Sequence, residues 1–195
     1  MTEQVVDKPE IVIVWFKRDL RFTDHEALFR AQNQPLPILL IYCFEPSVMH
    51  YHDSDVRHWR FVHQSLRDMN EKLQELNAQI YLFHSEVISL FSELQQLYTI
   101  KTIFSHQEVG NQITYERDSK VKTFCTEHQI TWNEYAHNAV QRGGNSRVNW
   151  EKRWESIMMQ KPFLVSETDW NFFGFPLEEY HRLKGDALAA EITSD

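Results

Sequence analysis

Five short apolar runs alternate with longer amphipathic stretches along the chain. The first run, residues 11–16, is apolar at every position, which is typical of a strand buried on both faces of a parallel sheet. Further runs, rich in the β-branched and aromatic residues that favour strands, cover 37–44, 80–83, 100–105 and 130–135. Because strands and helices alternate, the sequence predicts an α/β fold: a doubly wound, five-stranded parallel sheet in a Rossmann-like three-layer sandwich.

Amphipathic periodicity predicts the helices between these strands. Over 56–76, apolar residues recur at spacings of three and four, which places them on one helical face. Either Ser54 or Asp55 can cap the start of this helix. A second stripe covers 87–97, with Ser85 as its possible cap. Further helices are predicted at about 24–32 and 112–128.

The regular alternation ends near residue 160, and this divides the chain. We expect an N-terminal tail at 1–9, one α/β domain at 10–160, and an extension at 161–195 that is part linker and part docking segment. A length of 195 residues suits a single domain with such an extension.

Charge and cysteine content limit the partners and the compartment. The 20 basic and 28 acidic residues give a net charge of −8, which argues against tight nucleic-acid binding by this chain alone, because neutralising phosphates requires clustered Lys and Arg. Cys43 and Cys125 are far apart and form no C-x-x-C pair, as expected in a reducing compartment. There is neither a signal-peptide core nor an apolar run of membrane-spanning length, so we expect a cytoplasmic protein without membrane contact.

Polar side chains follow the predicted strands at the edge where ligands bind in open α/β sheets, outside the carboxyl ends of the strands and near the point where strand order reverses. If the first strand is central, this crevice lies between the loops that follow Phe16 and Ser105. The first of these loops carries Lys17, Arg18, Asp19, Arg21 and Asp24. The other carries His106, Gln107, Glu108 and Asn111, while the loops after the second and fifth strands add Glu45, His50, His52 and His137.

The charged segment 17–21 allows two interpretations. In one, Asp19 pairs with an arginine and holds the loop in place. In the other, the arginines bind an anion or a partner's carboxylate bidentately. Both hold at once if different arginines do each job.

The usual catalytic, phosphate-binding and metal-binding motifs are absent. The sequence has no G-x-G-x-x-G or Walker A loop and no G-x-S-x-G nucleophile motif, and Gly143-Gly144 is interpreted as the end of a loop. Histidines gather near His52, but without the helical spacing and third ligand of a metal site, so we expect no metal. Glu108 beside His106 is weak evidence for acid–base chemistry, and we predict no catalytic residue.

The segment 13–28, I-V-W-F-K-R-D-L-R-F-T-D-H-E-A-L, closely resembles the opening of DNA photolyases and cryptochromes. These usually begin with a strand ending in W-F-R-R-D-L-R, followed by D-N and A-L at the same spacing; here Lys17 replaces the commoner Arg and His25 the commoner Asn. The resemblance continues in 57–76, in 106–118 and in the exit segment 138–154, so it covers about residues 10–160.

The resemblance implies an N-terminal antenna domain. In the family, this domain can hold a light-harvesting pigment (a folate, FMN or a deazaflavin) that passes excitation energy to a catalytic FAD. By the same resemblance, Glu108 matches a carboxylate that contacts the pterin in folate-binding relatives, and His52 falls near another contact. Arg18 and Arg21 stand where the first loop borders the antenna cleft or the interdomain contact, while Asp19 and one arginine are expected to be structural.

In the family, FAD is bound by a separate, helical C-terminal domain, which also binds DNA and splits pyrimidine dimers. We therefore expect FAD only in a domain outside this sequence, a partner in the form of that FAD-binding helical domain in the same or another chain, and DNA contact only through it. This chain alone is not expected to be catalytically active. Two alternatives remain: a nucleotide-binding module of the wider fold group that includes electron-transfer flavoproteins, and a non-catalytic interaction domain that docks through its aromatic segment 170–175.

Overall fold

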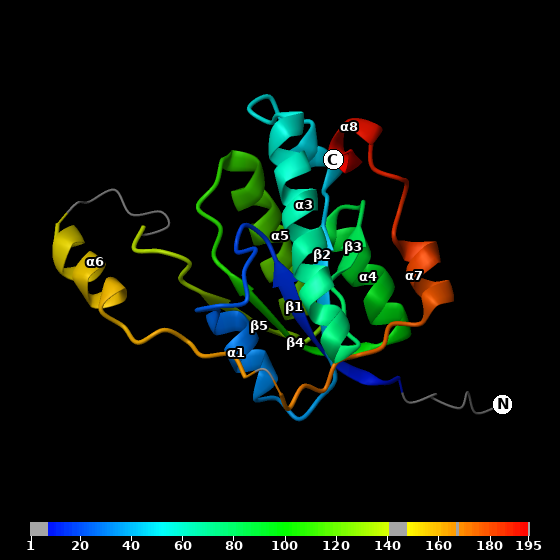
Figure 1. The fold of residues 1–195 in the computed structure, drawn as a ribbon, viewed down its shortest axis with the longest axis horizontal. Helices are drawn as coiled ribbons and strands as arrows, with labels where there is room; N and C mark the ends of the chain where they lie inside the picture. Colours follow the sequence, from blue (N-terminus) through cyan, green and yellow to red (C-terminus); the bar gives the residue numbers. More distant parts are fainter. Residues whose placement is uncertain (1–7, 141–147, 167, 195) are drawn as a thin grey trace.

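The computed structural model describes residues 8–140, 148–166 and 168–194. Five parallel strands form one sheet in the order β3-β2-β1-β4-β5 (Figure 1). They are β1 (Glu10–Phe16), β2 (Ile38–Cys43), β3 (Tyr81–Phe83), β4 (Thr99–His106) and β5 (Thr131–Tyr135). The predicted doubly wound parallel sheet is confirmed, and every strand lies within one or two residues of its predicted position.

β1 occupies the centre of the sheet. Val14 pairs with Leu40 on β2 and with Phe104 on β4, so β1 has a strand on each side. Residues 11–16 are fully or almost fully buried, which explains their unbroken apolar run. Strand order reverses between β1 and β4, and the loops that follow these two strands therefore face each other.

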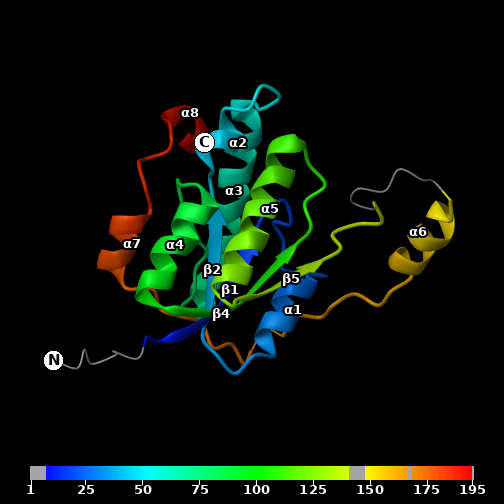
Figure 2. The same cartoon turned by 180° about the vertical axis from the view of Figure 1, so that it is seen from behind.

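Helices cover both faces of the sheet. α1 and α3 pack on one face through Leu28 and Leu66, and α4 and α5 pack on the other through Phe91 and Val121 (Figures 1 and 2). The helices up to β5 are α1 (Glu26–Gln32), α2 (Pro46–Met49), α3 (Val56–Leu73), a 3-10 turn (Gln74–Leu76), α4 (Val87–Leu97) and α5 (Gln112–Glu127). The predicted helix 56–76 thus changes to a tighter turn over its last three residues.

Of the two helix caps predicted from the sequence, one is confirmed and one is wrong. Asp55 caps α3, accepting the Arg57 N–H at 2.9 Å, as one of the two alternatives predicted. Ser85 as the cap of α4 is wrong: Glu86 takes that position without a side-chain hydrogen bond, and Glu45 from another loop accepts the Val87 N–H at 3.2 Å. A cap supplied through tertiary contact leaves no local pattern in the sequence.

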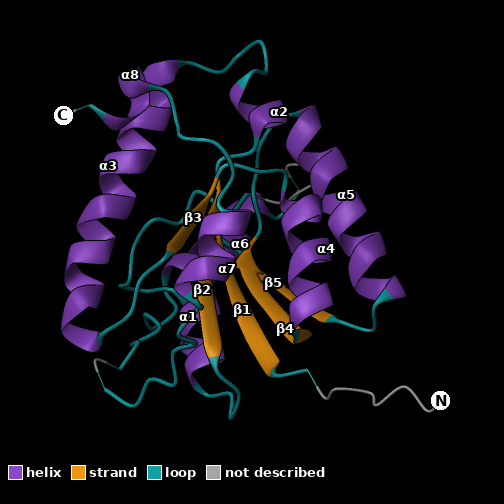
Figure 3. Ribbon diagram, turned by 90° about the vertical axis from the view of Figure 1, so that its right-hand side faces the viewer, coloured by secondary structure: helices purple, strands orange, loops and turns teal. Residues whose placement is uncertain are grey.

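The chain after β5 forms α6 (Trp150–Met158), α7 (Leu177–Leu183) and α8 (Ala190–Thr193). The last two lie against the domain, and Figure 3 shows α8 beside α3. The Ile38 N–H donates to Asn171 O at 2.7 Å, the His84 N–H donates to Lys184 O at 2.7 Å, and Phe175 is buried in the core. The described part of the extension therefore wraps around the domain. Gly143 and Gly144 lie outside the described residues.

Within the described residues, no helix is both long and apolar enough to cross a membrane.

Candidate functional site

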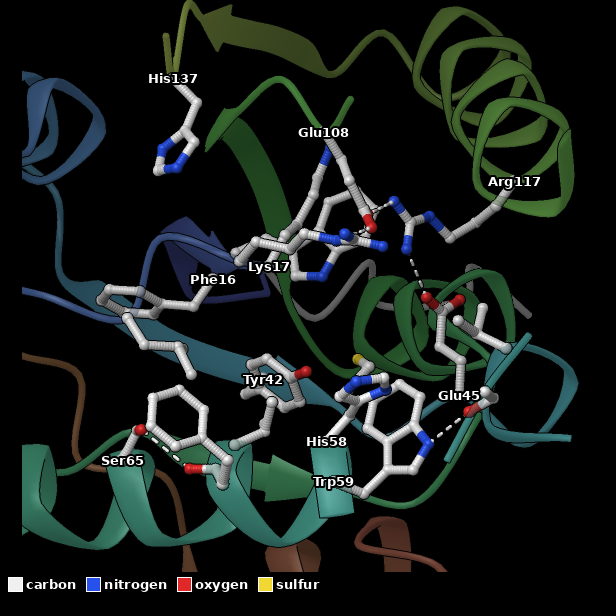
Figure 4. Close-up of a pocket in the computed structure, with 18 of the residues that line it drawn as sticks. Phe16, Lys17, Tyr42, Glu45, His58, Trp59, Ser65, Glu108, Arg117 and His137 are labelled. Atoms are coloured by element: carbon white, nitrogen blue, oxygen red, sulfur yellow. Dashed lines mark hydrogen bonds and ion pairs between the residues drawn. The ribbon is translucent and has the colours of Figure 1, made fainter. Parts of the chain in front are cut away.

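A pocket of about 640 Å³ opens at the carboxyl edge of the sheet, between the loop after β1 and the start of α3 (Figure 4). It lies where the reversal of strand order predicts a ligand crevice. Its lining residues come from β1, β2, α2, α3 and α5 and from the loops after β1, β2, α2, β4 and β5.

One wall of the pocket is apolar and aromatic. Phe16 and Tyr42 come from the central strands, while Trp59, Phe61 and Val62 come from the first two turns of α3. Phe61 stands at the mouth and is 68% exposed. Aromatic side chains that remain solvent-accessible beside a cavity provide a surface on which a flat ring system can pack.

The opposite side of the pocket is a chain of charges. Arg18 Nε donates to Glu108 Oε1 at 2.7 Å, and Arg117 Nη2 donates to Glu108 Oε2 at 2.6 Å. Arg117 also donates through Nη1 to Glu45 Oε2 at 2.8 Å, and its guanidinium lies 4.9 Å from the ring centre of Trp15. One buried arginine therefore fixes two glutamates from different loops and places them beside an indole ring (Figure 4).

These contacts set the ionisation of the two glutamates. Burial raises the pKa of Glu108, but Arg117 and Arg18 outweigh it and hold that pKa below its ordinary value. Burial dominates at Glu45, whose pKa is raised although Arg117 opposes the shift. Glu108 is thus a fixed anion and hydrogen-bond acceptor on the pocket wall, covered by the Arg18 side chain, which is 61% exposed.

Lys17 is the buried member of the first loop. Its ammonium donates to Glu134 at 3.1 Å and to Asp118 at 3.5 Å, and it lies 4.3 Å from the ring centre of Trp15. A lysine held by two carboxylates and an aromatic face is structural. The position of the photolyase-like segment at which Arg is commoner is therefore taken here by a residue that stabilises the pocket wall.

Asp19 is also structural, but through histidines rather than an arginine. The His106 Nδ1 lies 2.6 Å and the His25 Nε2 lies 2.8 Å from Asp19 Oδ2, and the Lys17 N–H donates to Asp19 Oδ1 at 2.8 Å. Burial raises the pKa of Asp19, but the two histidines outweigh it and hold that pKa well below the ordinary value. The predicted Asp19–arginine pair is therefore corrected to a buried Asp–His–His triad.

The same triad is the one group of three potential metal ligands within reach of a single ion among the described residues. Proton placement does not suit a metal there. The Leu28 N–H donates to His25 Nδ1 at 3.0 Å, so the proton of the neutral ring lies on Nε2, the nitrogen that faces Asp19. A protonated nitrogen cannot ligate a metal, and the 2.6 Å contact between His106 Nδ1 and Asp19 Oδ2 is a hydrogen bond.

Arg21 is the structural arginine of the first loop. It donates to Thr23 O and Asp24 O at 3.1 Å each, and its Nη1 lies 3.4 Å from His137 Nδ1. Arg21 and His137 both line the pocket, so this pair closes the side of the pocket nearest β5.

Three of the four predicted cofactor-binding residues come together at the pocket: Arg18, Arg21 and Glu108. His52 is not among the lining residues; it is exposed, and its ring lies 4.4 Å from that of Tyr51. The neighbouring Asp53 lines the pocket instead and accepts from Asn111 Nδ2 at 3.0 Å.

Sequence reasoning missed Arg117, Trp15 and the apolar wall on α3. The apolar periodicity over 56–76 predicts that Trp59 and Val62 pack on the sheet, which they do, but it does not show that they also line a pocket. One signal pointed to Arg117: it follows Glu116 and precedes Asp118 near the start of a helix that leaves the ligand edge.

Comparison with known proteins agrees with this architecture. The family model described as "DNA photolyase" matches residues 12–146. A cryptochrome DASH from Synechocystis sp. is 32% identical over 106 residues, 52% of this chain and 22% of that protein. A cryptochrome DASH from Arabidopsis thaliana is 23% identical over 157 residues, 77% of this chain and 25% of that protein.

Solved structures show the same fold. The Synechocystis cryptochrome structure matches with a TM-score of 0.61 and 26% identity over 68% of this chain and 28% of that one. A photolyase from Sulfolobus tokodaii, described with two FAD molecules and as implying a novel light-harvesting cofactor, matches with a TM-score of 0.68 and 15% identity over 90% of this chain and 42% of that one. The chain spans between a fifth and a quarter of the length of the curated relatives named above. With the family model covering well over half of its residues, this chain belongs to the DNA photolyase family.

Proposed function

We propose that the pocket binds a planar, light-absorbing antenna pigment: a folate, FMN or a deazaflavin. The observation that carries this proposal is the pairing of an aromatic wall with the ionised Glu108 across a pocket of about 640 Å³. Pterin, flavin and deazaflavin rings are flat and apolar over their faces, with N–H and C=O groups along one edge. An aromatic wall accommodates the ring face, and a carboxylate accepts from the edge.

The size of the pocket supports a ligand of this class. Small-molecule sites commonly occupy about 300–1,000 Å³ and combine apolar lining with a few fixed polar groups. Glu108 and Glu45 are fixed by Arg117, while Arg18 is exposed enough to move aside or to contact a ligand's anionic tail.

We further propose that a FAD-binding helical domain, in the same or another chain, completes the functional protein, and that DNA contact, light-driven repair or light sensing requires that domain. Supporting this, the chain spans about a quarter or less of its curated relatives. Trp150 and Trp154 on α6 stack at 6.5 Å and are 50% and 43% exposed, and no residue of α6 is buried. Figure 1 shows α6 apart from the sheet and its covering helices. An apolar helical face of this kind suits a protein partner.

Pigment binding is tested with the purified chain. FMN, a deazaflavin, a folate and ATP are each offered at micromolar concentration, followed by gel filtration and an absorbance spectrum of the protein fraction. One pigment is expected to be retained while ATP is not. Retention of none of the three pigments contradicts the proposal, and retention of ATP instead favours the nucleotide-binding alternative.

The role of Glu108 is tested with Glu108→Gln, which keeps the shape and removes the charge. We expect at least a tenfold weaker affinity for the retained pigment, equivalent to about 1.4 kcal/mol. Glu71→Gln, an exposed position on α3 outside the pocket, is the matched control and should bind like the parent. Equal affinity of Glu108→Gln and the parent would show that the carboxylate does not contact the ligand.

The partner proposal is tested by sedimentation of the chain with a separately produced FAD-binding helical domain of the family. Association that is lost in Trp150→Ala/Trp154→Ala and kept in Leu164→Ala, another exposed apolar position, supports it. Association that is unchanged in the double variant removes α6 as the contact. Self-association of the chain that is lost in the same double variant would show that α6 contacts a second copy of the chain instead of the FAD-binding domain.

A further inference from the structure

Three histidine rings stand in a row from the start of α1 to the wall of the pocket. The ring centres of His25 and His106 are 4.5 Å apart, and those of His106 and His137 are 5.7 Å apart. His25 and His106 are buried with Asp19, while His137 lines the pocket. The row crosses the sheet edge and joins the loops that follow β1 and β5 through the last residue of β4.

His25 can cap α1 only while its imidazole ring is neutral. Its Nδ1 accepts the Leu28 N–H at 3.0 Å and thereby caps α1. A second ring proton would sit on Nδ1, and this N–H would then face the backbone N–H of Leu28, which is also a donor. Protonation of His25 therefore removes the cap of α1, and the loop between β1 and α1 loses a contact that fixes its C-terminal end.

His137 follows the same logic at the other end of the row. Its Nδ1 lies 3.4 Å from Arg21 Nη1, a distance at which the neutral ring accepts from the guanidinium. Protonation would place two positive groups against each other at that contact. Arg21 also holds the backbone of Thr23 and Asp24, so its displacement would loosen the same loop.

The loop that these contacts hold forms one side of the pocket. Between β1 and α1, the chain is fixed by Asp19, which accepts the Lys17 N–H at 2.8 Å, and by a turn in which the Arg21 N–H donates to Asp19 O at 2.8 Å. Lys17, Arg18, Leu20 and Arg21 line the pocket. The shape of this wall therefore depends on the Asp19 cluster and on the two neutral histidines.

We propose that His25 and His137 are positioning residues for pigment binding: in their neutral forms they hold the loop between β1 and α1 in the shape that lines the pocket, and acidification releases that loop and the pigment together. The inference rests on the proposed antenna function for the identity of the ligand, while the loop transition is a property of the chain itself. In this chain, His25 stands where the family commonly has Asn, which cannot titrate.

The surroundings of both rings agree with neutral forms at pH 7. Burial lowers the pKa of His25, and Arg21 and His106 lower it further, outweighing Asp19, the acidic group that faces it. Burial also lowers the pKa of His137, again with Arg21, His106 and His25 lowering it and Asp19 raising it. Each proton that must leave on binding changes affinity by up to about tenfold per pH unit below the pKa concerned. Two histidines therefore give up to about a hundredfold per unit.

Asparagine is the matched substitution at both positions, because its Oδ1 stands in for the accepting Nδ1 and does not titrate. The test is hydrogen exchange of peptides covering 17–29 between pH 7.5 and pH 5.0, corrected for intrinsic rates and performed without ligand. We expect the parent to lose protection at least tenfold on acidification. His25→Asn/His137→Asn should stay within twofold, and His181→Asn, an exposed control on α7, should behave like the parent.

Two results would overturn the proposal: a parent whose loop protection does not change with pH, or a double variant that loses protection as the parent does. If the variant does not fold, the parent is titrated by NMR. The chemical shifts of the loop amides must then change over the same pH range as the ring signals of His25 or His137, and a different pH range rejects the proposal. Pigment affinity measured over the same range for FMN, the deazaflavin and the folate tests the coupling. Failure of all three pigments to bind at pH 7.5 rejects the antenna function alone. A pigment affinity that stays constant while the loop loses protection rejects the positioning role.

Discussion

At the scale of single residues, Arg117 determines how the pocket is charged. Its guanidinium is almost fully buried, with Glu45, Glu108 and Asp118 around it and Trp15 beneath it. Burial opposes the charge, but the three carboxylates outweigh it and raise the pKa of Arg117. Because the carboxylates are buried as well, the arginine and its partners depend on each other.

Arg117→Met is expected to destabilise the fold by about 3–5 kcal/mol, because it leaves Glu45 buried without its cation and Glu108 with Arg18 alone. Urea unfolding at pH 7 measures this loss. Arg182→Met removes an exposed arginine, paired with Glu93 at 3.3 Å, and should cost about 0–1 kcal/mol. Equal small losses in the two variants would show that the Arg117 cluster does not stabilise the fold.

Asp19 adds a pH dependence of the same sign as that of the two histidines, but at lower pH, because its folded pKa and theirs all lie below their ordinary values. Its pKa in the folded chain lies well below the ordinary 3.8, so the unfolded chain takes up the proton first as the pH falls. The stability that Asp19 contributes is present above about pH 4 and is lost as the pH falls towards the folded pKa. Asp19→Asn should be less stable at pH 7 and show a shallower loss of unfolding free energy below pH 4. An unchanged acid slope in urea unfolding would contradict this.

At the scale of elements, sequence patterns predict what burial dictates. The run at 11–16 is apolar throughout because β1 has a strand on each side and a helix layer on each face, so its strand character is readable without the structure. Caps are less readable. The α4 start relies on Glu45, which is 42 residues away in sequence, and α1 begins at Glu26 because His25 caps it.

The extension after β5 depends on one glycine for its contact with the sheet edge. Gly185 has φ of 77°, and a Cβ there would lie 2.2 Å from His84 O. Gly185→Ala should therefore destabilise this contact by about 1–3 kcal/mol and make the last helices more sensitive to protease. Gly174→Ala is the control, since nothing lies within 4 Å of its Cβ position. Equal protease sensitivity of the two variants would show that the extension does not need this contact.

At the scale of the whole molecule, the fold was predictable from the sequence, but the arrangement of the site only in part. The parallel sheet and its layers follow from alternation and burial, and the position of the crevice follows once the structure shows β1 to be central. Arg18 and Glu108 are 90 residues apart in sequence, and Asp19 and His106 are 87 apart, so their pairing depends on tertiary structure. His52 was placed near the site by its position after the second strand and by resemblance, but the turn after α2 directs Asp53 to the pocket instead.

Two features of the described residues bear on what this chain can bind. The chain spans a quarter or less of the length of the curated relatives named above, and its described residues form the pocket of about 640 Å³ at the sheet edge and expose Trp150 and Trp154 on α6. These features suit a pigment-holding module that delivers excitation to a flavin domain, which is the arrangement we propose.

Pigment binding in the pocket is tested most directly by incubating the parent and Val62→Trp with each pigment, removing free pigment by gel filtration and recording the absorbance of the protein. Val62 lines the apolar wall, and an indole there would fill the pocket where the ring is proposed to lie. We predict one pigment per parent chain and none in the folded variant. A parent that retains no folate, FMN or deazaflavin, or a variant that binds as well as the parent, would contradict the central claim.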